Sequence, residues 1–329
     1  MLATVAFAVV AFMLTAYVLL DGYDLGIAAI SPLIAHTDRE RATTMAAIGP
    51  FWNGNEVWLI AGGAALFALF PAAYASSFSG FYLPFIVVLW MLMFRGIALE
   101  LRDHLDSQLW RQFWDTAFWL SSLLLVVLFG VALGNLVRGL PLDAHGYFTG
   151  TFAFLLNPYA LLVAVLAVAS LAQHGAAFAR LRIDGVPAER AAQLMARLWW
   201  VVLALYVAVS AATLAVRGTP AAVWLFVVPA ISLVSLIALR VASGAGRNGV
   251  AFAASSLFIA SLLLETAGTL YTYLLPAYPP GRGGVSIADA SPSPVALTVG
   301  LSVAIGGSVA VLLYASAVWR VLAGKVRVE

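Results

Sequence analysis

Nine apolar stretches, each long enough to form a helix that crosses a lipid bilayer, determine what this chain can fold into. A transmembrane helix needs about 20 apolar residues, and such stretches lie near 3–34, 50–70, 76–99, 114–137, 157–179, 196–216, 220–240, 249–275 and 295–319. Of the 329 residues, 63% are hydrophobic and 10% are charged, which is too little polar surface to cover a soluble core. We therefore expect an all-α polytopic membrane protein with nine transmembrane helices, and a single integral membrane domain over residues 1–329.

The positions of the basic residues predict how the chain lies in the membrane. Thirteen of the seventeen lysine and arginine residues fall in the polar segments on one side of the nine predicted helices, and three fall on the other side. By the positive-inside rule, we expect the N-terminus outside and the C-terminus in the cytoplasm. The sequence has no cysteine, which excludes disulfides, thiolate metal sites and cysteine nucleophiles. It also has no nucleotide-binding glycine motif and no basic patch for nucleic acid.

Two aspartates interrupt the first apolar stretch, in the segment LLDGYDLG. Asp21 and Asp24 are three residues apart, so they share one face of a helix, and ionisable groups in membrane helices usually face the interior of a bundle. Two carboxylates this close disfavour joint ionisation. They could relay protons or pair with an arginine, or they could be structural groups near the membrane interface, and the pattern supports both interpretations equally.

The second and third apolar stretches contain further polar residues. Asn53 and Glu56 fall on one face of a helix that begins near Pro50, and we expect them to line a polar interior with the two aspartates. Arg95 could extend its charged end to the interface, or it could neutralise a carboxylate, and we favour the ion pair. Glu100 is expected at the interface, either at the opening of a polar route or simply solvated.

Two isolated ionisable residues remain in the second half of the chain. His174 has no second haem or metal ligand at a suitable spacing, so we interpret it as a hydrogen-bonded core histidine and predict no metal site in this chain. Glu265 lies beside small residues in LLLETAGTLY. It could pair across helices or belong to a pathway, and we favour the structural role.

Three segments in the N-terminal third carry a resemblance to a known family. They are LLDGYDLGIAAISPLI, DRERATTMAAIGPFWNGNEVWLIAGGAALFALFPAAYASSFSGFYLP and FRGIALELR. Their order, nearly without gaps from about residue 18 to 102, resembles subunit II of the cytochrome bd-type quinol oxidases. From 103 to 329 the resemblance consists of the number and length of the apolar stretches and of the AQHG segment in the fifth.

The resemblance implies a fold and a function. The fold would be two four-helix bundles plus a peripheral helix, with the motif-bearing bundle in residues 1–137 and the second bundle and peripheral helix in 157–319. The chain would be the non-haem subunit II of a terminal oxidase in the bacterial cell (inner) membrane, which oxidises membrane quinol on the outer side and reduces oxygen to water with cytoplasmic protons. Haems b and d would belong to the partner, subunit I, so this chain alone would not be catalytic. It would stabilise subunit I and contribute proton and oxygen routes, and the family leaves open a structural quinone and a small accessory subunit.

One position departs from the family pattern. The family's polar positions match Asp21, Asp24, Glu56, Arg95 and Glu100 of this sequence. Many members have an aspartate where this chain has Asn53, and that aspartate is proposed for proton transfer. An asparagine cannot ionise, so a proton path here would use bound water or Glu56, or the partner would supply the protons.

Two other functions fit the membrane composition. A secondary transporter with an intramembrane carboxylate coupling site would fit the pair of aspartates and a first helix broken near them. A structural scaffold would only bury the helices of another subunit. The ordered motif block favours the oxidase subunit over both.

Overall fold

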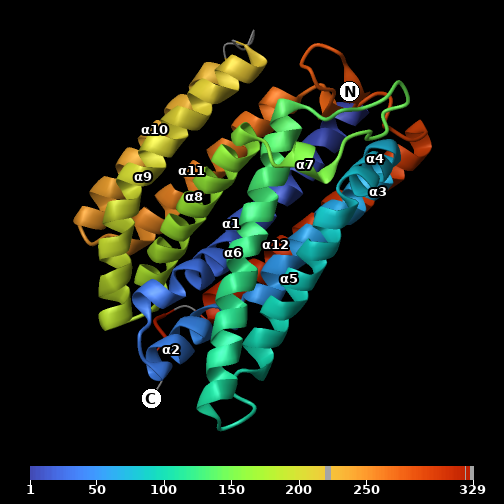
Figure 1. Ribbon diagram of the computed structural model, residues 1–329. Coiled ribbons are helices and arrows are strands. Elements are labelled where there is room, and N and C mark those ends of the chain that lie inside the picture. The colour runs from blue at the N-terminus through green and yellow to red at the C-terminus, as the bar shows by residue number, and fades with distance from the viewer. Residues whose placement is uncertain (219–223, 323, 327–329) are drawn as a thin grey trace.

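The described part of the chain is a bundle of long helices with two short strands at one end (Figure 1). The computed structural model describes residues 1–218, 224–322 and 324–326. The helices are α1 (Leu2–Ile34), α2 (Asp38–Ile48), α3 (Trp52–Leu69), α4 (Pro71–Gly80), α5 (Tyr82–Leu101), α6 (Gln108–Arg138), α7 (Phe152–Leu155), α8 (Pro158–Arg182), α9 (Val186–Arg217), α10 (Trp224–Gly244), α11 (Asn248–Leu270) and α12 (Pro294–Val321), and the strands are β1 (Tyr273–Pro276) and β2 (Gly284–Ser286).

Eight helices of the described chain are long and apolar enough to cross a membrane, whereas nine apolar stretches were predicted. They are α1, α5, α6 and α8–α12. The predicted stretch 50–70 corresponds to α3, which has 18 residues and is less apolar because its first turns carry Asn53, Asn55 and Glu56. The predicted stretch 76–99 is divided, since α4 ends at Gly80 and α5 begins at Tyr82. Residues 220–223 of the seventh stretch lie outside the described residues.

The prediction of an all-α fold omits a small β-hairpin. The stretch predicted over 249–275 ends as a helix at Leu270, and β1 and β2 then pair antiparallel, with Tyr273 opposite Ser286. The segment between the strands is rich in glycine and proline, which favours a turn over a longer helix. The hairpin lies at the end of the bundle where α1 begins, and α12 ends at the opposite end, near α2 (Figure 1).

The segment between α1 and α3 contains a short polar helix with a complete N-terminal cap. The Thr37 side chain accepts from the backbone N–H of Glu40, and the Glu40 carboxylate accepts from the backbone N–H of Thr37 at 3.1 Å and of His36 at 2.6 Å. Arg190 of α9 also donates to Glu40, at 2.9 Å. Partial burial acts to raise the pKa of Glu40, but these backbone donors and the Arg190 guanidinium outweigh it, so the pKa lies below its ordinary value.

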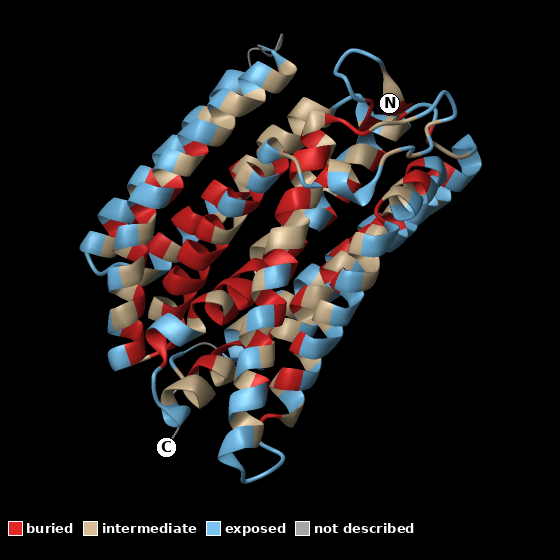
Figure 2. Cartoon of the chain, in the orientation of Figure 1, coloured by how far each residue is buried: buried red, intermediate tan, exposed pale blue. Residues whose placement is uncertain are grey.

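Helices α1 and α8 cross in the middle of the bundle at a contact that only glycine permits. A Cβ atom on Gly26 would collide with the backbone of Leu171, and one on Gly175 would collide with the backbone of Gly26. Small residues allow this kind of close approach between membrane helices. The buried residues run along α8 and along the parts of α1 and α6 that face it, while the outer helices expose much of their surface (Figure 2).

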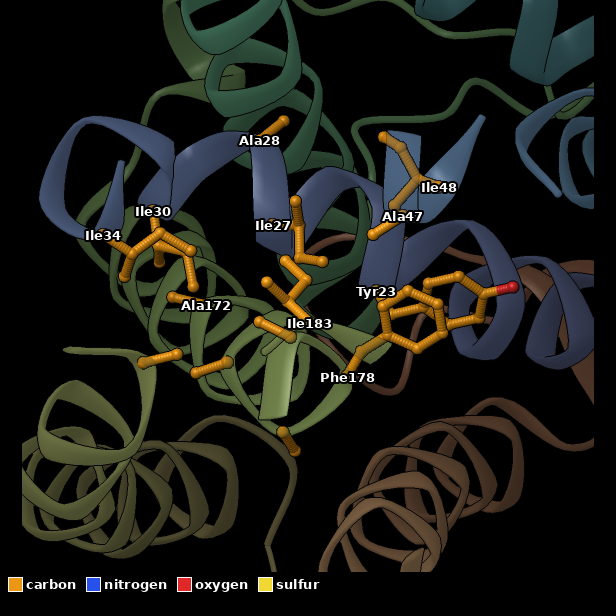
Figure 3. Packing of buried hydrophobic residues seen from close by; sticks show 14 of the residues in the cluster. Tyr23, Ile27, Ala28, Ile30, Ile34, Ala47, Ile48, Ala172, Phe178 and Ile183 are labelled. Atoms are coloured by element: carbon orange, nitrogen blue, oxygen red, sulfur yellow. The ribbon is translucent and has the colours of Figure 1, made fainter. Parts of the chain in front are cut away.

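The C-terminal half of α1 packs into an aromatic and aliphatic core with α2 and α8. Tyr23 stacks on Phe178, with ring centroids 4.0 Å apart and an interplanar angle of 13°. Ile27 and Ile183 lie beside this stack, and Ile48 of α2 is in the same cluster (Figure 3). The same turns of α1 also carry Asp21 and Asp24, so this packing fixes the rotation of α1 and with it the direction of both carboxylates.

Candidate functional site

A buried ion pair joins α1 to α5. The Arg95 guanidinium donates from Nη1 to Asp21 Oδ2 at 2.8 Å and from Nη2 to Asp21 Oδ1, a two-point contact. Arg95 is 1% exposed and Asp21 is 0% exposed. Charge-assisted contacts of this geometry are strong when they are shielded from water. The predicted ion pair between Arg95 and a carboxylate of the acidic pair is therefore present.

The second aspartate is held from α3. Asn55 Nδ2 donates to Asp24 Oδ2 at 2.8 Å, and Nδ2 also lies 3.1 Å from the backbone oxygen of Leu20. Arg95 Nη2 is 3.9 Å from Asp24 Oδ2, and Asp24 is 0% exposed. One guanidinium thus serves two buried carboxyl groups, and the amide of Asn55 supplies a donor but no charge. The charge of this group balances when one of the two carboxyls holds a proton.

Asn53 does not take the place that the sequence predicted for it. It is exposed, whereas Asn55 is 4% exposed and reaches the acidic pair. The buried face of α3 consists of Asn55, Trp58, Gly62, Ala65 and Leu69. These positions recur every three or four residues, as one helix face does. Asn53 lies two residues before Asn55 and is therefore on nearly the opposite side of α3. Asn55 precedes Trp58 by three residues and Gly62 by seven, and this helical spacing is a signal that could have identified Asn55.

The two glutamates predicted near this group differ in their position relative to it. Glu56 of α3 is half-buried and within electrostatic reach of Arg95 and Asp21. Glu100 is exposed, because on α5 the buried positions near it are Arg95 and Ala98. The polar interior therefore contains Asp21, Asp24 and Arg95 with Glu56 at its margin, and Glu100 is not part of it in this chain.

Several polar atoms around the ion pair are buried and have no protein partner among the described residues. They are Asp24 Oδ1, Arg95 Nε and Tyr17 Oη. Tyr17 lies one helical turn before Asp21 on the same face of α1. Buried polar atoms are ordinarily satisfied by ordered water when protein offers no partner. The cluster therefore has the donors and acceptors needed to bind internal water.

A second ionic cluster, which the sequence did not identify, lies at the end of α5. Arg102 is 1% exposed. It donates to Asp115 of α6 at 2.6 Å, to Asp38 of α2 at 2.6 Å and to Asp103 at 2.8 Å. Burial acts to lower the pKa of Arg102, but these carboxylates outweigh it and raise the pKa above its ordinary value. The three acids come from distant segments, so only the fold brings them together. Arg102 joins the ends of α2, α5 and α6.

His174 is buried and bonded at both ring nitrogens. Nε2 lies 3.1 Å from the backbone oxygen of Leu19, and Nδ1 lies 2.9 Å from the Ser255 hydroxyl. A carbonyl oxygen only accepts, so Nε2 carries the proton and Nδ1 accepts from Ser255. The ring stacks on Phe252, with centroids 5.0 Å apart. His174 therefore does not fit the role of an axial haem ligand, and no group of three or more metal-ligating side chains occurs among the residues described.

Comparisons with known proteins assign the chain to a family. The family model described as "Cytochrome bd terminal oxidase subunit II" matches residues 2–322. The chain is 30% identical to the "Probable cytochrome oxidase subunit 2" of Haemophilus influenzae, covering 89% of this chain and 87% of the relative. It is 29% identical to the "Cytochrome bd-I ubiquinol oxidase subunit 2" of Escherichia coli K12, covering 97% and 94%.

A solved structure has the same fold. The bd oxidase from Geobacillus thermodenitrificans contains a chain that superposes with a TM-score of 0.81 at 19% identity, covering 97% of this chain and 98% of that one. Residues 2–322, which the family model matches, include α1, α3 and α5 with the acidic pair, Asn55 and Arg95. This chain belongs to the cytochrome bd terminal oxidase subunit II family.

Proposed function

We propose that this chain is the non-haem subunit II of a bd-type quinol oxidase and that it stabilises a haem-bearing subunit I. Its relatives are named as subunits of ubiquinol oxidases. The observation that carries the proposal is the buried pair between Asp21 and Arg95, because it lies within the motif block that matches the family and joins two helices of that block. Haems b and d would be held by subunit I, and the engagement of both His174 nitrogens supports this assignment. The chain alone would not oxidise quinol.

The ion pair would act first as a structural element. Removing one member of a buried ion pair leaves an uncompensated charge in a low-dielectric interior, which is strongly destabilising. The pair fixes α5 against α1, and the exposed faces of α3 and α5 carry large apolar side chains such as Ile60 and Trp90. We propose that subunit I binds a surface whose shape depends on this pair.

The same cluster would provide a proton position. Two carboxyl groups share one guanidinium, so the group is neutral with one proton bound and carries one net negative charge after that proton leaves. Glu56 lies between this interior and the surface of α3, where Asn53 is exposed. A proton route in this chain would therefore pass from water at Asn53 to Glu56 and then to the acidic pair. A route for oxygen through this chain also belongs to the family expectation, as do a structural quinone and a small accessory subunit.

We further propose nine membrane crossings, with α3 and α4 together forming the ninth. Helix α1 begins at one end of the bundle and α12 ends at the other (Figure 1), and such a path requires an odd number of crossings. The distribution of arginine supports an outer N-terminus and a cytoplasmic C-terminus. The two bundles would be residues 1–137 and 157–319, docked through the glycine contact between α1 and α8, in the bacterial inner membrane.

The transporter alternative loses one of its two supports. A break in the first helix near the acidic pair would have favoured it, but α1 is continuous from Leu2 to Ile34, and its one proline, Pro32, lies near its end. The carboxyl groups also have a guanidinium and an amide as fixed partners.

The test measures haem content and quinol oxidase activity in the complex purified through a tag on this chain. Arg95→Ala should lower both, because subunit I would lose its support. Arg197→Ala is the matched control, since it removes an exposed arginine of α9 and should leave both unchanged. Asp24→Asn should keep the haems but slow turnover if the acidic pair carries protons. Wild-type haem content and activity in Arg95→Ala would reject the stabilising role, and wild-type turnover in Asp24→Asn would reject the proton role.

A further inference from the structure

A second buried carboxyl group lies in the other half of the molecule, where α9, α10 and α11 meet. Glu265 of α11 is half-buried within a membrane-spanning helix. The Tyr206 hydroxyl of α9 donates to Glu265 Oε1 at 3.1 Å, and the Ser232 hydroxyl of α10 donates to the same atom at 2.5 Å. Ser232 Oγ is also 2.8 Å from Ser261 Oγ of α11. All three hydroxyl residues are buried. Glu265 is thus the end point of a group of hydroxyls supplied by three helices.

No cation neutralises this carboxyl group in the part of the chain that the structure describes. The ion pairs found there do not involve Glu265. On α10 the only charged residue is Arg240, eight residues from Ser232 and turned to the backbone of Ala196. On the other elements packed on α11, the ionisable groups have partners of their own. Asp21 and Asp24 of α1 are held by Arg95 and Asn55, and His174 of α8 is bonded to Ser255 ten residues before Glu265. Arg138 of α6 lies over the rings of Phe154 and Tyr278, and β1 offers only the uncharged Tyr273.

The two hydroxyl donors are unequally distributed between the two oxygens of the Glu265 carboxyl group. Both hydroxyl contacts found for Glu265 converge on Oε1, and neither reaches Oε2. An ionised carboxylate spreads its charge over both oxygens and needs donors at both. A protonated carboxyl has one carbonyl oxygen that accepts, as Oε1 does here, and a hydroxyl that needs no donor, which fits the absence of a donor to Oε2 among the described residues. In a membrane-spanning segment without a counter-charge, the neutral form also avoids the cost of burying an unpaired ion.

We propose that Glu265 is a proton-binding site of the second half of the chain, in which Tyr206 and Ser232 hold the carbonyl oxygen Oε1 and Oε2 carries the proton. The site is separate from the group around Asp21, where Arg95 supplies the charge. Its ligand is the proton, and burial in an apolar span without a counter-charge favours the neutral acid at neutral pH. The inference depends on the local contacts alone and does not require the oxidase role.

Infrared spectroscopy of the purified complex tests the proposal directly. The wild-type minus Glu265→Gln difference spectrum at pH 7 should contain the carbonyl stretch of a protonated carboxyl group. This band should shift in D₂O, unlike the bands of lipid esters. Ser232→Ala removes one hydrogen-bond donor to the carbonyl oxygen. Because such a hydrogen bond lowers the frequency of the carbonyl stretch, the band should move to higher frequency in this variant. Ser232→Ala retains Glu265, so it remains informative if Glu265→Gln assembles poorly. A carboxylate band in place of the carbonyl band at pH 7 would overturn the proposal.

A chemical label gives an independent readout. Dicyclohexylcarbodiimide reacts with protonated carboxyl groups in apolar surroundings, so peptide mass spectrometry of the treated complex should find the adduct on Glu265 and not on Asp21. The infrared band and the adduct should be unaffected by sodium chloride when ionic strength is held constant with choline chloride. Loss of both signals on adding sodium would mean that the site binds a metal cation in place of the proton, and this would also overturn the proposal.

Discussion

Breaking the pair between Asp21 and Arg95 is predicted to be among the most costly single changes that the chain can undergo. Arg95 is 1% exposed and Asp21 is 0% exposed, so bulk water cannot solvate the charge that remains when one partner is removed. Removing one member of such a pair costs about 3–5 kcal/mol. Arg95→Ala would then shift the unfolding equilibrium by a factor of roughly 10² to 4 × 10³.

A double-mutant cycle separates the ion pair from lost packing. Arg95→Ala alone leaves two buried carboxyl groups with only the amide of Asn55 as donor. Asp21→Asn removes the carboxylate but leaves the arginine without its two-point acceptor. The double variant loses the pair but leaves fewer uncompensated charges, so its cost should be less than the sum of the single costs by about 2–3 kcal/mol.

The assay is unfolding of the purified complex in mixed micelles with increasing SDS, followed by circular dichroism. Arg197→Ala controls for the removal of an arginine, because Arg197 is exposed, and it should change stability by less than about 0.5 kcal/mol. Additive costs in the cycle, or a cost below about 1 kcal/mol for Arg95→Ala, would show that the buried pair does not have the role assigned to it.

Three further predictions use matched pairs or pH. Gly26→Ala should destabilise the bundle by several kcal/mol, on the order of the larger overpacking costs, because the new Cβ would meet the backbone of α8. Gly63→Ala, in open space on α3, should be neutral or slightly stabilising. Equal shifts of the unfolding temperature in the two variants would contradict this. Asn55→Ala should cost about 1–3 kcal/mol by leaving a buried carboxyl without its donor, whereas Asn53→Ala should be silent in the same denaturation assay. The pKa of Glu40 is lowered from its ordinary value of 4.5, so its contribution of about 1 kcal/mol is complete above pH 4.5 and is lost as the pH falls through the lower folded value. The unfolding temperatures of wild type and Glu40→Gln should therefore differ at pH 7 and converge in acid. A difference that stays constant with pH would refute the predicted direction of the pKa shift.

Some of this architecture could be read from the sequence because one physical rule fixes it. An arginine inside a membrane helix needs a partner, so an ion pair between Arg95 and a carboxylate was predictable, while the choice of Asp21 as that carboxylate came from the structure. The helical character of the apolar stretches follows similarly from the need to satisfy backbone groups in lipid. In both cases the alternative, an unpaired charge or an unsatisfied backbone group in lipid, is strongly unfavourable.

Other features depend on how helices are turned against one another. Asn53 and Asn55 are both polar and two residues apart, and the choice between them depends on the rotation of α3, which its buried face sets at Trp58 and Gly62. Arg102 meets Asp38 and Asp115 only because the ends of α2, α5 and α6 converge. No spacing along the chain indicates that convergence, so the second ionic cluster needed the structure.

The central claim is that this chain is the haem-free partner of a haem-bearing oxidase subunit. The most direct measurement is the dithionite-reduced minus oxidised absorption spectrum of the complex purified through a tag on this chain, compared with that of the chain expressed without its partner. We predict bands of haems b and d in the complex and none in the isolated chain. A complex without these bands, or an isolated chain that carries them, would contradict the account.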